Sequence, residues 1–314
     1  LAEMAATKND EATQKWAMDK ASVLLSRFEQ DWWMPEQGLY ADSLALNQKV
    51  PTNPLAALGT APITKLEQLY WTNATPMETN FASSDHANTT LPNLESSVFT
   101  GTNGFYQAGV GGGPNGKGDL EASALPSSVM AVAEANYGRV DESLRYVLDI
   151  ARQLDLEQPG ALPEQMPSPG YLPFPFQPFT RRAMVMQAWS SYGVLYPIVH
   201  YFLGIQPHMP QRLIIVLPQL PSSLPHLSIQ NLRVGDEILA VTAQHSDKLY
   251  VTEVTLPVGC RLEIGHTLPA NASIESVTLN GKAAEYEVRS THRGSEIVAQ
   301  GFTAGRYRLV IQTR

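Results

Sequence analysis

The sequence is short of several features that mark particular classes of protein. It contains one cysteine, Cys260, so no disulfide can form within the chain, and no second cysteine or histidine stands at metal-ligand spacing from it. Basic residues are also scarce, because 22 Lys and Arg stand against 30 Asp and Glu, a net charge of −8. Such a surface repels a phosphate backbone, so we expect no nucleic acid partner. No metal or cofactor is expected either.

A long hydrophobic run and a signal peptide are missing as well. The longest apolar stretch, residues 194–205, is interrupted by Pro197 and His200, so no membrane span is expected. The chain starts at Leu1 without the basic and apolar regions of a signal peptide, so we expect a processed or excised piece. Cytoplasmic and secreted locations are not distinguished. With 314 residues, 43% hydrophobic and 17% charged, a globular protein of about two domains is expected.

Helical periodicity is confined to the first two thirds of the chain. Apolar side chains recur there at spacings of three and four, with N-cap residues such as Asp10 and Asp141 and with Gly138 and Gly204 at helix ends. The predicted helices span residues 11–31, 127–136, 141–154 and 180–203, with a weaker one over 64–71. Pro197 predicts a kink in the fourth of them.

From Arg212 onward the hydrophobic period changes to two, which is typical of strands. Predicted strands cover residues 212–217, 237–242, 249–256, 261–264, 274–279, 285–288 and 306–311. Asn280-Gly281 is a strong hairpin signal, and Arg293-Gly294 and Ala304-Gly305 are further turn points. The sequence therefore predicts a mainly α protein with a β appendage. Helical hairpins occupy residues 1–210, a small antiparallel β-sandwich occupies 211–314, and the boundary lies within 204–210.

Several motifs favour ordinary structural roles. The glycine-rich stretch 111–118 matches part of a nucleotide-binding loop, but Gly118 replaces the Ser or Thr that would bind magnesium, and no strand is predicted before it. We interpret it as a mobile or substrate-lining loop that precedes a helix over 119–134. Asp85-His86 lacks a third metal ligand nearby, and His200 lies on an apolar helix face, as core histidines do.

One segment combines a carboxylate with aromatic residues. Gly160-Ala-Leu-Pro-Glu164-Gln165 is followed by a loop rich in proline and aromatics, which contains Tyr171 and Phe176, and then by Gln187-Ala-Trp189-Ser190 in a helix. Aromatic rings stack on sugar rings, and a carboxyl group handles protons near a glycosidic bond. The alternative is that Glu164 is a surface loop residue or a helix-terminus anion and that the aromatics only pack between helices.

These motifs resemble the C-terminal part of six-hairpin (α/α toroid) glycosidases, a group that includes glucoamylases and glycogen-debranching amylo-glucosidases. In them a Glu of such a turn is the catalytic base and a Trp-Ser pair opens the following helix. Residues 28–42 and 129–138 resemble other parts of the same toroid, and an appended β domain is usual. The resemblance implies a partial toroid, with Glu164 as catalytic base and with Trp189, Gln187, Tyr171 and Phe176 at the sugar site.

The general acid of that family has no counterpart here. Residues 1–210 hold only about half of the helices of a complete toroid, and relatives place the acid far upstream of the base, before Leu1 in this numbering. Asp85, Asp119 and Glu121 lie in or near loops, but none of them matches the family's acid motif. The missing half is expected as a separate chain or a cleaved segment, or it is absent.

Two functions of different classes follow. The first is an inverting glycoside hydrolase that acts on α-glucosides or related oligosaccharides with Glu164 as general base. A rhamnosidase or another toroid hydrolase would change only the substrate. The second is a non-catalytic carbohydrate-binding or interaction fragment, which follows if the acid-bearing half never joins this chain. An oligosaccharide is the expected partner in both.

Overall fold

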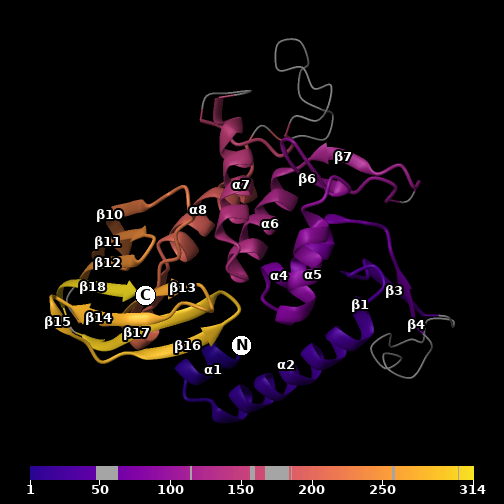
Figure 1. Ribbon diagram of the computed structural model, residues 1–314. Coiled ribbons are helices and arrows are strands. Elements are labelled where there is room, and N and C mark those ends of the chain that lie inside the picture. The colour runs from indigo at the N-terminus through magenta and orange to yellow at the C-terminus, as the bar shows by residue number, and fades with distance from the viewer. Residues whose placement is uncertain are drawn as a thin grey trace.

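The computed structural model describes residues 1–46, 63–113, 115–155, 160–166, 184, 186–256, 259–302 and 304–314 (Figure 1). Seven α-helices occur in these residues: α1 (Ala2–Thr7), α2 (Glu11–Trp32), α4 (Thr75–Glu78), α5 (Ser84–Leu94), α6 (Ala124–Asn136), α7 (Val140–Ala151) and α8 (Ala188–Pro197). Strands make up about 36% of the chain, so the prediction of a mainly α protein is wrong. None of the described helices is long and apolar enough to cross a membrane.

Helix α2 follows the sequence pattern closely. It begins after Asp10, whose carboxylate accepts a hydrogen bond from the backbone N–H of Thr13 at 3.0 Å, as an N-cap does. None of its residues is fully buried, and Leu24 is 60% exposed. Only its C-terminal end packs firmly, where the rings of Phe28 and Tyr40 stack with their centroids 5.0 Å apart. The apolar face of α2 is therefore left largely uncovered.

Helices α6, α7 and α8 form the centre of the helical part. Helix α6 is buried from Ala124 to Ala135 apart from Leu125. The hydroxyl of Ser143 on α7 donates to the carbonyl of Ala131 on α6 at 2.6 Å. Helix α8 lies so close to α6 that a Cβ on Gly193 would stand 2.1 Å from the Ser128 hydroxyl oxygen. Small side chains thus let the helices approach closely.

The fourth predicted helix is shorter than expected. Helix α8 begins at Ala188, with Gln187 extended at its N-cap, whereas residues 180–183 and 185 lie outside the described residues. Pro197 ends α8, and the chain continues as a π-helical turn, η3 (Ile198–Phe202), up to Gly204. Pro197 has no backbone N–H to donate within the α-helix. The predicted kink is therefore a change from α-helical to π-helical hydrogen bonding after this residue.

Two of the predicted helical segments contain a strand at their start. Residues 64–71 contain β4 (Ile63–Leu66), which pairs antiparallel with β3 (Ser43–Leu46), and the Lys65 ammonium donates to the carbonyl of Trp33 at 2.6 Å. The predicted helix over 119–134 starts as β7 (Asp119–Ala122), which pairs with β6 (Gly104–Ala108). In both segments, pairing with a strand elsewhere in the sequence determines the conformation. A short window of sequence does not include that partner strand.

The remaining short elements of the helical part are as follows. They are β1 (Trp33–Met34), β2 (Leu39–Tyr40), η1 (Trp71–Ala74), β5 (Thr100–Gly101) and η2 (Arg152–Asp155). Strands β1 and β2 form a hairpin, and β5 pairs with β6.

The C-terminal part contains two sheets. The first has the order β10-β11-β12-β18-β14-β15 and the second the order β16-β17-β13-β9-β8. Their strands are β8 (Ile205–His208), β9 (Leu213–Val216), β10 (His226–Val234), β11 (Glu237–Ser246), β12 (Leu249–Leu256), β13 (Arg261–Leu268), β14 (Ile274–Leu279), β15 (Lys282–Ala283), β16 (Glu287–Thr291), β17 (Gly294–Phe302) and β18 (Gly305–Thr313). A 3₁₀ turn, η4 (Met209–Gln211), joins β8 to β9.

The sheets agree with the predicted sandwich except in one pairing. The Thr252 hydroxyl on β12 donates to the carbonyl of Gly265 on β13 at 2.6 Å, so the two sheets are in contact. Asn280-Gly281 forms the turn between β14 and β15, with positive φ at both residues. The difference is that β9 and β13 run parallel, whereas an all-antiparallel sandwich was predicted.

The helical and β parts meet at Gly204. Its φ is +65°, and a Cβ there would stand 2.0 Å from the carbonyl carbon of Leu217. The N–H of Leu217 donates to the carbonyl of Gly204 at 2.9 Å, so two backbone segments are in contact at this residue. Because glycine has no Cβ, it can adopt this positive φ and lets the two backbone segments approach closely.

This geometry predicts that Gly204→Ala destabilises the protein more than the same change at Gly281. Gly281 has a similar φ of +78°, but a Cβ there meets nothing within 4 Å, so Gly281→Ala carries only the conformational cost. The steric overlap at Gly204 adds about 1–3 kcal/mol to the loss in free energy of unfolding. Urea denaturation followed by circular dichroism measures both variants, and equal losses would contradict the close approach.

Candidate active site

The loop that carries Glu164 lies across the N-terminal end of α6. The carbonyl of Glu164 accepts hydrogen bonds from the N–H of Ala124 at 2.8 Å and from the hydroxyl of Ser123 at 3.3 Å. Gln165 forms a β-bridge with Ser123, and the N–H of Met166 donates to the carbonyl of Ala122 at 2.8 Å. Residues 164–166 therefore continue the edge of β7 and have a fixed position.

The same loop is joined to the start of α8. The Ser190 hydroxyl, which is fully buried, donates to the carbonyl of Pro163 at 2.9 Å. The N–H of Gln187 donates to the carbonyl of Leu162 at 3.0 Å. The backbone of the Glu164 loop is thus held between the N-termini of two helices.

The Glu164 side chain has one defined partner. Its Oε2 accepts a hydrogen bond from the N–H of Met184 at 3.1 Å, and its own N–H donates to the carbonyl of Met184 at 2.9 Å. The residue is partly exposed, and its Oε1 makes no hydrogen bond to another described residue. Among the described residues, one carboxylate oxygen of Glu164 thus has no hydrogen-bond partner, and the backbone of Glu164 is held on two sides.

The predicted site residues fall into two groups. Glu164, Gln187 and Trp189 come together, because Trp189 precedes the buried Ser190 and its carbonyl accepts from the Ser128 hydroxyl at 2.8 Å. The indole N–H of Trp189 is buried and has no partner among the described residues. Tyr171 and Phe176 lie outside the described residues, so their role at a sugar site stays a prediction.

The three carboxylates considered for a general acid differ in position. Glu121 and Asp119 lie on β7, directly before the residues that pair with the Glu164 loop, whereas Asp85 lies in the first turn of α5. Its neighbour His86 contacts Glu29 through Nδ1 and stacks on Trp33 with ring centroids 3.8 Å apart. No group of three metal-ligating side chains occurs among the described residues.

Sequence reasoning missed a buried ion-pair network between α6 and α5. Glu134 is fully buried and accepts a hydrogen bond from Nε of Arg139 at 2.7 Å, and Arg139 also contacts Glu95. Burial raises the pKa of Glu134 well above its usual range, and the charge of Arg139 opposes this rise. An acidic residue inside the apolar run 129–135 was the signal that could have revealed it.

Two further carboxyl groups lie in poorly solvated positions near these helices. Burial raises the pKa of Asp149 on α7 to about 6, and Arg152, which donates to it at 2.8 Å, opposes that rise. Burial also raises the pKa of Glu78, which accepts a hydrogen bond from the Tyr192 hydroxyl at 2.9 Å. Both carboxyl groups have protein partners, so we assign them to packing of the helices.

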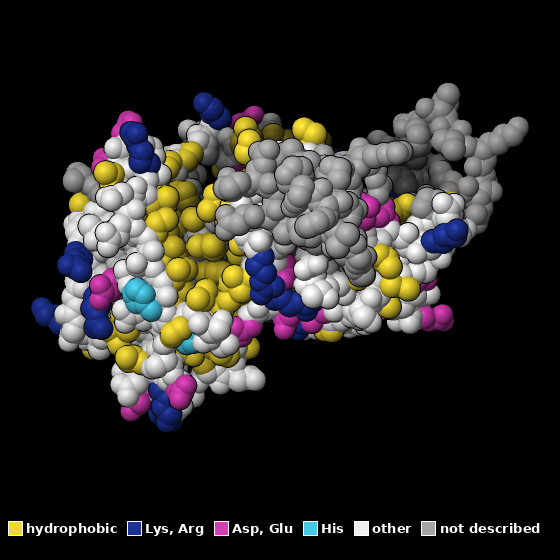
Figure 2. All heavy atoms as spheres, turned by 90° about the horizontal axis from the view of Figure 1, so that it is seen from above, with side chains coloured by type: hydrophobic (Ala, Val, Ile, Leu, Met, Phe, Trp, Pro, Cys, Tyr) yellow, Lys and Arg dark blue, Asp and Glu magenta, His cyan; other side chains and the backbone are white. Residues whose placement is uncertain are grey.

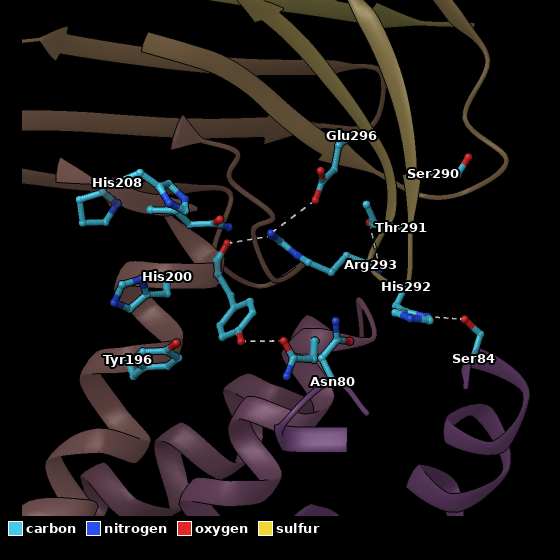
Figure 3. Close-up of a pocket in the computed structure, with 14 residues that line it drawn as sticks. Asn80, Ser84, Tyr196, His200, His208, Ser290, Thr291, His292, Arg293 and Glu296 are labelled. Carbon is cyan, nitrogen blue, oxygen red and sulfur yellow. Dashed lines mark hydrogen bonds and ion pairs between the residues drawn. The ribbon is translucent and has the colours of Figure 1, made fainter. Parts of the chain in front are cut away.

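A large cavity lies elsewhere in the molecule. It has a volume of about 880 Å³ and is lined by residues of α8, η3, β8 and the β16–β17 turn (Figure 3). Glu164 lines neither this cavity nor either of two smaller ones, of about 380 and 250 Å³. The second cavity, of about 380 Å³, is lined by aromatic side chains including Phe28, Trp32 and Phe81 and by Asp42.

Comparison with solved structures relates the fold to glycosidases. An α-L-rhamnosidase from Dictyoglumus thermophilum matches 99% of this chain with a TM-score of 0.57 and 13% identity, and the match covers 30% of that protein. The rhamnosidase from Streptomyces avermitilis has 12% identity and a TM-score of 0.45, covering 77% of this chain and 21% of that one. A GH127 β-L-arabinofuranosidase from Geobacillus stearothermophilus has 10% identity and a TM-score of 0.32, covering 78% and 41%.

The first of these similarities, to the α-L-rhamnosidase from Dictyoglumus thermophilum, shows a shared fold. The chain shares its fold with a part of that α-L-rhamnosidase and spans about 30% of its length. No protein-family model matches the sequence, and no match is found to a curated protein sequence.

Proposed function

We propose that this chain forms part of an inverting glycoside hydrolase in which Glu164 is the general base. The observation that carries the proposal is the anchoring of the Glu164 loop to the N-termini of α6 and α8, with one carboxylate oxygen that has no hydrogen-bond partner among the described residues. A fold shared with part of a rhamnosidase supports the same class of enzyme. In such a reaction Glu164 accepts a proton from the water that attacks the anomeric carbon.

The general acid is proposed to come from outside this chain. In inverting glycosidases the two carboxyl groups stand about 6.5–9.5 Å apart, so that a water molecule fits opposite the leaving group. Asp119 and Glu121 approach the Glu164 loop from β7, but both already interact with other groups. We therefore assign no acid among Asp85, Asp119 and Glu121, and we place it in a further half of the enzyme.

Exposed apolar surface supports the proposal of a missing half. On α2 the side chains of Trp16 and Leu24 are 55% and 60% exposed, and on α8 that of Leu195 is 62% exposed. Figure 2 shows hydrophobic side chains gathered beside the β part on the face that is seen from above. Exposed apolar patches mark interaction sites. We propose that helices of a toroid cover this apolar surface, either on a separate chain or on a segment of the same protein.

The substrate is proposed to be an α-glycoside. The resemblance of the sequence motifs favours α-glucosides, and the rhamnosidase that shares the fold makes α-L-rhamnosides the competing choice. The second candidate function is a non-catalytic carbohydrate-binding or interaction fragment. It is favoured by the limited share of the rhamnosidase that this chain spans.

Product stereochemistry tests this proposal. The complete enzyme, which is this chain together with its acid-bearing half, is expected to release a sugar whose anomeric configuration is opposite to that of the substrate. Proton NMR during hydrolysis of aryl α-D-glucoside and aryl α-L-rhamnoside reads both the configuration and the preferred sugar. Release of the retained anomer would contradict the role of Glu164 as a base for water, and turnover of neither substrate would favour the non-catalytic fragment.

A further inference from the structure

The cavity of about 880 Å³ between the helical and β parts has the size of a ligand pocket, for which about 300–1,000 Å³ is typical. It lies at the C-terminal end of α6, where Asn136 lines it, whereas Glu164 contacts the N-terminal end of the same helix. A helix of 13 residues separates the two ends by about 20 Å. The cavity is therefore a separate place from the candidate active site.

The cavity has two facing walls from different parts of the chain. Figure 3 shows Tyr196, His200 and His208 on one side and Thr291, His292 and Arg293 of the β16–β17 turn on the other. Tyr196 is 37% exposed, and its ring packs against that of His200 with centroids 4.2 Å apart. An exposed aromatic ring in a polar pocket offers a flat apolar face with a hydroxyl at its edge.

Four of the polar side chains that line this cavity are neutral and have no hydrogen-bond partner among the described residues. Asn80, Tyr196, Gln206 and Ser290 make no side-chain hydrogen bond to another described residue, although all four line the cavity. Amide and hydroxyl groups each both donate and accept hydrogen bonds. Such a set matches the hydroxyl groups of a polyol, which also donate and accept.

The charged groups of the cavity are already paired. Arg293, whose side chain is only 8% exposed, donates to the carbonyls of Tyr201 and Leu217, each at 3.3 Å, and lies 3.8 Å from Glu296. Its Nε donates to the amide oxygen of Gln219 at 3.3 Å. An anionic ligand would compete with these partners, because three of the five N–H groups of the guanidinium already donate and Glu296 offsets its charge. The pairing thus favours an uncharged ligand.

The histidines do not change this conclusion. The Nδ1 of His292 contacts the Ser84 hydroxyl at 2.5 Å, and burial lowers the pKa of His200, which disfavours its charged form. Together with His208 they form no cluster that could hold a metal ion, among the residues that the structure describes.

We propose that this cavity is a binding site for a neutral saccharide, with Tyr196 as the stacking platform and Gln206 and Asn80 as hydrogen-bonding groups. The proposal does not depend on hydrolysis at Glu164, because none of these residues contacts the Glu164 loop in the described contacts. The one carboxylate that lines the cavity, Glu296, is paired with Arg293 at 3.8 Å, so the lining residues contain no pair of carboxyl groups of the kind that glycosidases use. The role of the cavity is binding, not bond cleavage.

Histidine NMR of the full chain tests the proposal. His200 and His208 line the cavity, so their ring resonances, assigned with His200→Gln and His208→Gln, report a ligand in it directly. Maltotriose and L-rhamnose are the neutral probes, and D-glucuronate is the charged comparison. We expect at least one neutral sugar to shift these resonances and D-glucuronate to bind more weakly.

Substitutions of residues that line the cavity measure how much each side chain contributes to sugar binding. Tyr196→Ala is expected to weaken binding about fivefold to tenfold through loss of the ring face, and Gln206→Ala about threefold to tenfold through loss of a hydrogen bond. Leu195→Ala is the matched control, because Leu195 precedes Tyr196 on the same helix, is 62% exposed and does not line the cavity. Melting temperatures show that each variant is folded.

Three results would overturn the proposal. They are the absence of any histidine shift with both neutral sugars, tighter binding of D-glucuronate, and binding that is lost in Glu164→Gln but kept in Tyr196→Ala. The last result would assign the sugar to the Glu164 site. Failure of hydrolysis at Glu164, in contrast, leaves the histidine shifts unchanged, so the two proposals are tested separately.

Discussion

Glu164→Gln is expected to lower the hydrolysis rate of the complete enzyme by about 10²–10⁴-fold, the usual contribution of a general base. A carboxylate can accept the proton of the attacking water, and an amide of the same shape cannot. The amide oxygen can still accept the hydrogen bond from the N–H of Met184, and the loop keeps its bonds to Ala124 and Ser190, because these involve the backbone. The fold and sugar binding are therefore expected to survive.

The matched control is Glu142→Gln. Glu142 lies on α7 with its side chain 39% exposed and has only a long surface ion pair, at 3.7 Å, with Arg145. The same chemical change there is expected to leave turnover within about twofold, because surface pairs of this kind contribute little. Turnover, sugar affinity and melting temperature are compared for both variants and the unchanged protein.

Azide provides an independent test of the same residue. A small anion can occupy the place of the attacking water when the base is missing, so azide is expected to restore part of the reaction of Glu164→Gln. The product would be a glycosyl azide of inverted configuration. A variant that keeps full turnover without azide would show that Glu164 is an ordinary loop carboxylate.

The chain of 314 residues by itself is expected to hydrolyse aryl glycosides weakly or not at all. General acid catalysis typically contributes about 10²–10⁴-fold, and we place the acid on the missing half. The measurement compares the purified chain with the same chain after mixing or coexpression with the polypeptide encoded upstream. Activity should rise when the two combine.

Strong turnover by the isolated chain would contradict this expectation. It would mean that one of its own carboxylates is the acid, and the amide variants of Asp85, Asp119 and Glu121 would then identify it. Gel filtration of the mixture is the control, because a complementing half must also form a complex. Loss of turnover in an amide variant without loss of the complex would assign the acid.

The sequence predicted single helices and strands better than the pairing of strands in the sheets. Helix α2 and strands β12 and β14 have the predicted ends or lie within one residue of them, because their periodicity and turn residues are contained in a short window. Strands β8 and β10 were missed. Pro207 interrupts the first, and a register shift between Ile229 and Leu232 obscures the alternation of the second.

The sequence suggested residues for the candidate site but not their geometry. The motif around Glu164 and the Trp-Ser pair could be found by resemblance, and the structure brings them together through the bond between Ser190 and Pro163. The wall of the large cavity could not be found in this way. Tyr196 and Arg293 are about a hundred residues apart and carry no common motif, so only the packing of the two parts makes them neighbours.

The parallel pairing of β9 with β13 bears on the order in which the protein assembles. Strand β9 can pair with β8 as soon as both have been synthesised. Its other edge pairs with residues 261–264, which are synthesised almost fifty positions later. Contacts between such distant parts of a chain slow folding, because the intervening loop must close first. During synthesis, therefore, the helices and β8 emerge early, and one edge of β9 stays open until about half of the C-terminal part has left the ribosome.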